Sequence, residues 1–263
     1  MIQENQLIPY ETSSIPLSPW LVISPHPDDE TFGMEGTLLL ARHRKIKVSL
    51  IVLTDGAMGG NNKTEDIVQI RRKELLKVSK LLGIKQVIFQ DCPDGNLIVT
   101  RSMINQLAAA IHEIKPKSVF FPSPMELNPD HRSAAVLTWE ALRASKFLGT
   151  AYFYEILVQG QINKLIDITK VADEKKEIMS SYESQLSENN YIEVIEAIDI
   201  SRSLTLPDHV KRAEGFYVYA DLGIWAHLIP NFLDTNLKLN IQFFLTWLLS
   251  SYLKVPPVFA GSY

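Results

Sequence analysis

The chain has 263 residues, a formal net charge of −4 at pH 7 and 46% hydrophobic residues, which is typical of a globular protein with a sizeable buried core. Its 26 basic and 30 acidic residues create no broad positive field, so nucleic acid is not expected as a partner. The single cysteine, Cys92, excludes an intramolecular disulfide, and the N-terminus lacks the basic and apolar regions of a secretory signal. We therefore expect a cytoplasmic protein.

Short apolar runs followed by turn signals predict strands that are buried on both faces, at residues 20–24, 47–54, 86–90 and 118–122. Segments with helical spacing lie between and after these strands, at residues 64–83, 102–115 and 130–147. The first of these helices is expected to stop at Gly83. Strands that alternate with helices indicate an α/β fold, with a mostly parallel sheet covered by helices on both faces.

Beyond residue 150 the pattern is less regular. Strands are predicted at residues 151–158 and 215–222, and helices at 170–186 and 191–198. No linker separates the two halves, so we expect a single domain over 1–263, with a core at about 18–160 and a C-terminal elaboration at about 161–263.

In the apolar stretch at residues 241–259, roughly a dozen residues precede a lysine and two prolines, which is short of the ~20 residues that a membrane span needs. It predicts a C-terminal helix that packs on the body of the protein or on a second copy in a homo-oligomer. The alternative is interfacial contact with a membrane or an apolar substrate.

Each of the first four predicted strands is followed by an unusual polar segment: HPDDE at 26–30, TDGAMGG at 54–60, DCPDGNL at 91–97 and SPMELNPDH at 123–131. Parallel strands end at one edge of their sheet, so these segments are expected to converge there. The glycine-rich loop at 55–66 is expected to be a mobile lid beside this site. It lacks the dinucleotide fingerprint, so a nucleotide cofactor is not expected.

A metal site is indicated by His26, Asp29 and His131. His26 and Asp29 are three residues apart around Pro27, which suits a first helical turn, so both side chains can face one cation. His131 follows another strand and supplies a third ligand. Two histidines and one carboxylate are the usual protein ligands of a catalytic zinc ion, although iron or cobalt would also fit. The alternative for the first segment is a solvated loop with a helix cap.

Together, HPDDE, TDG at 54–56, RRKELLKVSKLLG at 71–83, DG-x-L at 94–97 and PDHR at 129–132 resemble the LmbE-like, or PIG-L, zinc-dependent deacetylases. The resemblance covers about residues 18–145, with a fainter echo in YESQL at 182–186. It implies a Rossmann-like fold and hydrolysis of an N-acyl amide, commonly the N-acetyl group of an amino sugar or sugar conjugate. By position, it assigns His26, Asp29 and His131 to zinc and Asp28 to the role of general base.

Three further residues have two possible roles each. Arg71 matches an arginine that would reach substrate oxygens, or it forms an ordinary helix pair with Glu74. Asp94 contacts sugar hydroxyls or shapes a turn. Asp130 orients a histidine or caps the helix that begins there.

The chain departs from the family at Asn128, where a histidine is most common. Asparagine can donate a hydrogen bond to an oxyanion but does not ordinarily shuttle a proton, so Asp28 would act as both base and acid. Asn128 keeps open one alternative to an amino-sugar deacetylase, a metal-containing binding protein with weakened hydrolysis. A second alternative, an N-acyl hydrolase of a natural product or lipid-linked substrate, is suggested only by the C-terminal apolar segment.

Overall fold

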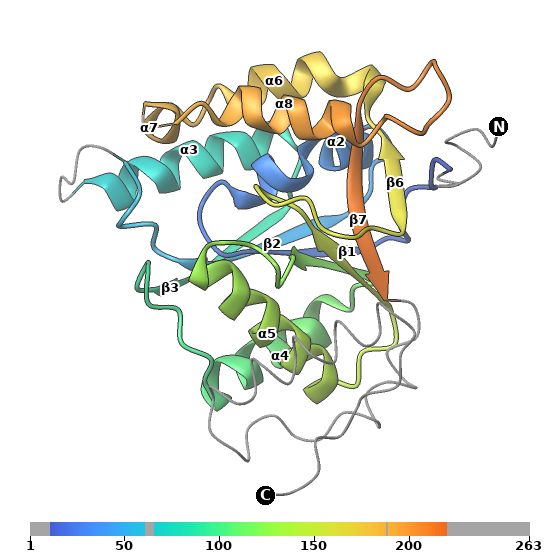
Figure 1. Ribbon diagram of the computed structural model, residues 1–263. Coiled ribbons are helices and arrows are strands. Elements are labelled where there is room, and N and C mark those ends of the chain that lie inside the picture. The colour runs from blue at the N-terminus through green and yellow to red at the C-terminus, as the bar shows by residue number, and fades with distance from the viewer. Residues whose placement is uncertain (1–10, 61–65, 188, 220–263) are drawn as a thin grey trace, which may run out of the picture. The chain divides into compact units, whose positions relative to one another are not determined.

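A computed structural model describes residues 11–60, 66–187 and 189–219, and within them lies one seven-stranded sheet (Figure 1). Its strands are β1 (Trp20–Ser24), β2 (Val48–Thr54), β3 (Gln86–Cys92), β4 (Ser118–Pro122), β5 (Thr150–Tyr154), β6 (Lys164–Asp167) and β7 (Ala213–Tyr219). Their order across the sheet is β3-β2-β1-β4-β5-β7-β6. The strands β1 to β5 are parallel to one another, and β7 runs antiparallel to β5 and β6. The expected mostly parallel sheet is confirmed.

Helices cover both faces of this sheet, as expected. The described helices are α2 (Asp29–His43), α3 (Ile67–Leu81), α4 (Arg101–Ile114), α5 (Pro129–Ala144), α6 (Ala172–Met179), α7 (Glu183–Leu186) and α8 (Tyr191–Ser201), with a 3₁₀ turn at Thr169–Val171. Figure 1 shows α4 and α5 on one side and the other helices on the opposite side. Gly83, where the sequence predicts the end of α3, has a φ of +70°, which suits glycine after a helix.

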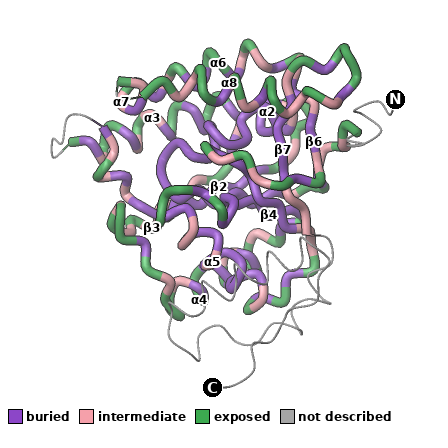
Figure 2. Tube along the Cα trace, viewed as in Figure 1, coloured by how far each residue is buried: buried purple, intermediate pink, exposed green. Residues whose placement is uncertain are grey.

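The burial pattern explains which strands the sequence identifies best. Every residue of β1, β2 and β4 is buried, which matches their continuous apolar runs (Figure 2). The prediction of burial on both faces is wrong for β3, whose residues are partly or fully exposed. Within the part of the chain that the structure describes, this strand lies at the edge of the sheet and pairs with β2 alone, so fewer side chains cover it.

The second half differs from the sequence prediction in detail. The four-residue strand β6 was not predicted, and the helix expected over 170–186 is split into α6 and α7. Among the described residues, no helix combines the length and apolar character needed to cross a membrane. The C-terminal segment 241–259 lies outside the described residues, as do 61–65 of the expected lid, so the predicted oligomer contact and the single domain over 1–263 stay predictions.

Helix α2 is kinked at Met34, whose φ of −154° and ψ of 25° are not helical. The kink frees backbone N–H groups at the start of the second half of the helix. Glu214 of β7 accepts hydrogen bonds from two of them, Gly36 N at 2.7 Å and Thr37 N at 2.8 Å. A buried carboxylate thus holds the helix whose first turn carries Asp29.

Candidate active site

The site lies where the strand order reverses. From β1 the chain builds β2 and β3 on one side and then returns to place β4 on the other side of β1. At such a point the loops that follow the two central strands diverge and leave a crevice at their carboxyl ends. His26 follows β1 and His131 lies in the first turn of α5 after β4, so the topology brings the two histidines together.

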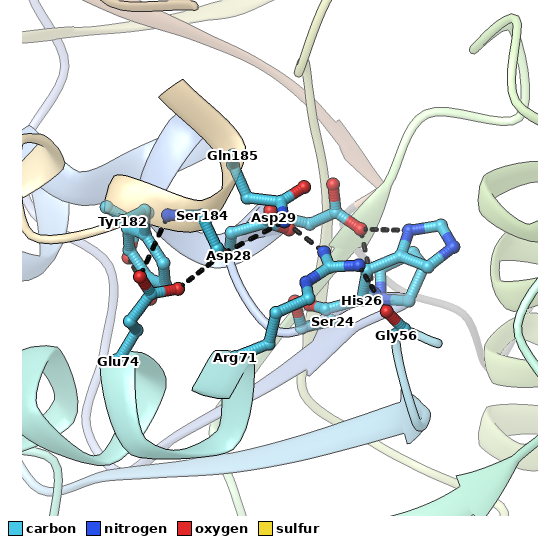
Figure 3. A network of polar contacts seen from close by, with 12 residues as sticks. Ser24, His26, Asp28, Asp29, Gly56, Arg71, Glu74, Tyr182, Ser184 and Gln185 are labelled. Atoms are coloured by element: carbon cyan, nitrogen blue, oxygen red, sulfur yellow. Dashed lines mark hydrogen bonds and ion pairs between the residues drawn. The ribbon is translucent and has the colours of Figure 1, made fainter. Parts of the chain in front are cut away.

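The turn between β1 and α2 fixes the first two metal-ligand candidates. Asp29 accepts a hydrogen bond from His26 N at 2.8 Å through Oδ2, and the same oxygen lies 2.9 Å from His26 Nδ1 (Figure 3). Asp28 lies in the turn just before α2, and its side chain makes no cap hydrogen bond. Its carboxylate is therefore available to face Arg71 instead.

Donor atoms of His26, Asp29 and His131 converge. His131 Nε2 lies 3.2 Å from Asp29 Oδ2 and 3.2 Å from His26 Nδ1. All three residues are buried and could hold a metal ion together. Ligand atoms in a tetrahedral zinc site, at about 2.0–2.1 Å from the ion, lie roughly 3.3 Å from one another. The spacing and the chemistry of these donors therefore fit zinc.

The electrostatics of the three side chains favour a positive charge among them. Burial lowers the pKa of His131, but the charge and hydrogen bond of Asp29 outweigh it and raise this pKa to about 9. Burial also lowers the pKa of His26, but the nearby carboxylates, with Asp29 first, outweigh burial and raise this pKa well above its ordinary value. Asp29 is buried too, yet both imidazoles lower its pKa below the ordinary value. Metal binding must displace the imidazole protons.

The second ring nitrogen of His26, Nε2, faces two more carboxylates. His26 Nε2 lies 3.1 Å from Asp94 Oδ1 and 3.4 Å from Asp130 Oδ2. Asp130 is itself fixed by Gly95 N at 2.7 Å and Leu97 N at 3.1 Å. The carboxylate of Asp130 therefore faces a histidine, as one of its two readings requires, and helix α5 is capped by another residue.

Arg71 points from α3 into the site and not toward Glu74. Its Nη2 donates to Asp28 Oδ2 at 3.0 Å, and its Nη1 donates to Gly56 O at 2.8 Å and lies 3.7 Å from Asp94 Oδ2. Glu74 instead accepts from the backbone and hydroxyl groups of Ser184, so the helix-pair interpretation is wrong. Burial raises the pKa of Asp28, and the Arg71 guanidinium opposes that rise.

Asn128 lies outside this cluster of contacts. It is the exposed N-cap of α5, and its Oδ1 accepts from Asp130 N at 2.8 Å. The cap role that was one of the two interpretations of Asp130 belongs to Asn128. An oxyanion role for the amide N–H₂ group of Asn128 stays a prediction.

Two substitutions separate the roles of Asn128. Asn128→Ala is expected to lower the free energy of unfolding by about 1 kcal/mol, whereas Asn128→Asp keeps a capping oxygen. If the amide also donates to an oxyanion, kcat falls in both variants with less effect on KM, because neither replacement has the N–H donor. Urea unfolding and initial rates measure the two effects. An unchanged kcat in Asn128→Asp would leave capping as the only role.

Sequence reasoning missed several buried polar residues around the site. Glu30 accepts from Ser24 Oγ at 2.9 Å and from Tyr182 Oη at 3.0 Å, which ties the first turn of α2 to the segment before α7. Tyr182 and Gln185 both belong to the YESQL segment that already echoed the family, and Figure 3 shows both beside the site. Glu126, buried behind His131, had no such signal.

Known proteins resemble this chain in sequence and in fold. Residues 21–142, which include His26 to His131, match the family described as PIG-L: GlcNAc-PI de-N-acetylase. Diacetylchitobiose deacetylase of Thermococcus kodakarensis is 30% identical over 191 residues, which are 64% of this chain and 70% of that protein. The chain belongs to the PIG-L family.

Other PIG-L relatives support the same grouping. Probable N-acetyl-alpha-D-glucosaminyl L-malate deacetylase 2 of Bacillus anthracis is 29% identical over 167 residues, 60% of this chain and 74% of that protein. The solved structure of N,N'-diacetylchitobiose deacetylase from Pyrococcus horikoshii has a TM-score of 0.71 and 26% identity, covering 80% of this chain and 86% of that one. The family resemblance drawn from the motifs is confirmed, and these relatives are deacetylases of N-acetylated sugars or their conjugates.

Proposed function

We propose that the protein is a zinc-dependent N-deacetylase that removes an acyl group, usually acetyl, from the nitrogen of an amino sugar or sugar conjugate. One observation carries this proposal: donor atoms of His26, Asp29 and His131 converge within 3.2 Å of one another, next to the buried carboxylate of Asp28. Family membership supports hydrolysis of an N-acetyl amide. The cytoplasmic location stays a prediction.

We assign each residue of the site a separate role in amide hydrolysis. When bound by His26, Asp29 and His131, zinc would supply a Lewis acid that activates water and polarises the amide carbonyl. Asp28 takes a proton from the attacking water and returns it to the leaving nitrogen, so the amide C–N bond breaks and acid and amine are released. Arg71 holds Oδ2 of Asp28, which leaves Oδ1 for the proton.

The remaining predicted site residues keep supporting roles. Asp94 and Asp130 face His26 and orient its ring. Arg71 and Asp94 lie on the same side of the site and are the proposed contacts for substrate oxygens. Iron or cobalt could serve in place of zinc, because both accept two imidazoles and one carboxylate.

Substrates with an apolar portion are a second candidate class. Met58 is 62% exposed beside Asp94, to which its backbone N–H donates. Leu127, next to Asn128 in the loop after β4, is 75% exposed. Large apolar side chains thus stand in two of the loops that form the site, where they suit an alkyl or aryl group on the substrate.

Release of primary amine from N-acetylated amino sugars, including alkyl glycosides of increasing chain length, tests the proposal. We expect release by zinc-loaded protein, loss of release after chelation and recovery when zinc is restored. Rates that rise with alkyl length would favour the apolar class. Release that is unaffected by complete removal of metal would contradict zinc dependence. A folded, zinc-binding protein that releases nothing would favour the binding-protein alternative.

A further inference from the structure

Glu126 is a buried acid that the proposed reaction does not yet use. It lies in the loop between β4 and α5, five residues before His131, and is 2% exposed. Its backbone is fixed at both polar groups: Glu126 N donates to Ser123 O at 3.2 Å, and Arg132 Nη1 donates to Glu126 O at 2.9 Å. The side chain therefore starts from a well-defined position.

The carboxylate of Glu126 is held by the loop that follows β5. Its Oε1 accepts from Ile156 N at 2.7 Å and Val158 N at 3.5 Å, and its Oε2 accepts from Leu157 N at 3.3 Å. Backbone N–H groups are strong partners for a carboxylate, and three together offset much of the cost of burying it. Oε2, which accepts one of these bonds, also faces the first turn of α5.

The residue of α5 that the Glu126 carboxylate faces is His131. Glu126 Oε2 lies 3.8 Å from His131 Nδ1, which is buried and has no hydrogen-bond partner among the described residues. The opposite nitrogen, Nε2, faces Asp29 and His26. A neutral imidazole that gives Nε2 to a metal must carry its proton on Nδ1, and that proton needs an acceptor. At 3.8 Å the contact is too long for a hydrogen bond, and a shift of about 1 Å would close it.

We propose that Glu126 is a positioning residue, which accepts the Nδ1–H of His131 and thereby holds Nε2 toward the metal. The proposal rests on the proposed function, since it assigns the partner of one metal ligand. It also gives the loop at 156–158 a role. Its three N–H groups fix the carboxylate, so this loop determines where the His131 ring points.

Glu126→Gln tests the proposal in the full chain, and Glu155→Gln is its matched control. Glutamine keeps the volume but turns one oxygen into a donor, which faces either a backbone N–H or the Nδ1–H of His131. Glu155 is also buried near this loop, but its carboxylate binds Arg202 Nε at 2.9 Å and Gly160 N, away from the metal ligands.

Zinc affinity is measured by competition with a chromophoric chelator, and the absorption spectrum of the Co²⁺ protein reports ligand geometry. We expect Glu126→Gln to weaken zinc binding about 10- to 100-fold and to shift the Co²⁺ bands. Glu155→Gln should change neither, even if it lowers stability as much. Equal affinity and equal spectra in all three proteins would overturn the role of Glu126. Failure of the wild-type chain to bind zinc would instead reject the metal site of the proposed function.

Discussion

Asp28→Asn is expected to lower kcat about 10²- to 10⁴-fold while the protein still binds zinc at its full stoichiometry. Asparagine has the shape of aspartate but cannot accept the proton of the attacking water. The carboxylate of Asp28 is not one of the three groups that could hold the metal, so replacing it leaves the metal ligands in place. Initial rates on an N-acetylated substrate and metal content of the dialysed protein are the measurements.

The same substitution also removes a negative charge from the rim of the site, so a control must separate this effect from loss of the base. Asp55→Asn serves, because Asp55 lies on the same rim and accepts from Ala57 N and Asp94 N without touching the ligands. It should lower kcat far less than Asp28→Asn. A loss of less than about tenfold in Asp28→Asn would exclude Asp28 as the general base.

The sequence predicted the site as well as it did because chemistry and topology coincide there. His26 and Asp29 stand directly after one buried strand and His131 after another, and neighbouring parallel strands place such residues at one edge. The apolar runs alone identified both strands. That the three side chains face one point follows from local contacts, such as His26 N to Asp29 Oδ2, that only the structure shows.

Other features depend on contacts distant in sequence. Nothing in the run at 86–90 shows that β3 is an edge strand, because the order of strands decides it. Glu74 was available as a helix partner for Arg71, and the approach of Ser184 from α7 decided against that pair. Glu126 looked like an ordinary loop acid, since its partners at 156–158 are some 30 residues away.

A second buried cluster controls stability rather than chemistry. Lys175 of α6 is 2% exposed and donates to Asp199 Oδ2 of α8 at 2.8 Å and Glu214 Oε1 of β7 at 2.9 Å. Burial lowers the pKa of Lys175, but these two carboxylates outweigh burial and raise it. The ammonium group thus stays charged, and it is the cation that both carboxylates share.

Lys175→Met is expected to lower the free energy of unfolding by about 3–5 kcal/mol, because it leaves two buried carboxylates without their cation. Lys176→Met is the control. Lys176 is the next residue, and its side chain is 55% exposed in a pair with Glu196 at 2.9 Å. Exposed pairs of this kind contribute about 0–1 kcal/mol. Urea unfolding of both variants gives the comparison.

The effect of Lys175→Met should extend to the active site. Glu214, which Lys175 neutralises, also holds Gly36 N and Thr37 N after the kink of α2, and the first turn of that helix carries Asp29. Without the ammonium group of Lys175, Glu214 and Asp199 repel each other, and Glu214 then holds these N–H groups less well. Zinc affinity should therefore fall in Lys175→Met, under conditions where it is still folded, and remain unchanged in Lys176→Met. Equal losses of stability in the two variants would show that the buried cluster contributes no more than the exposed pair.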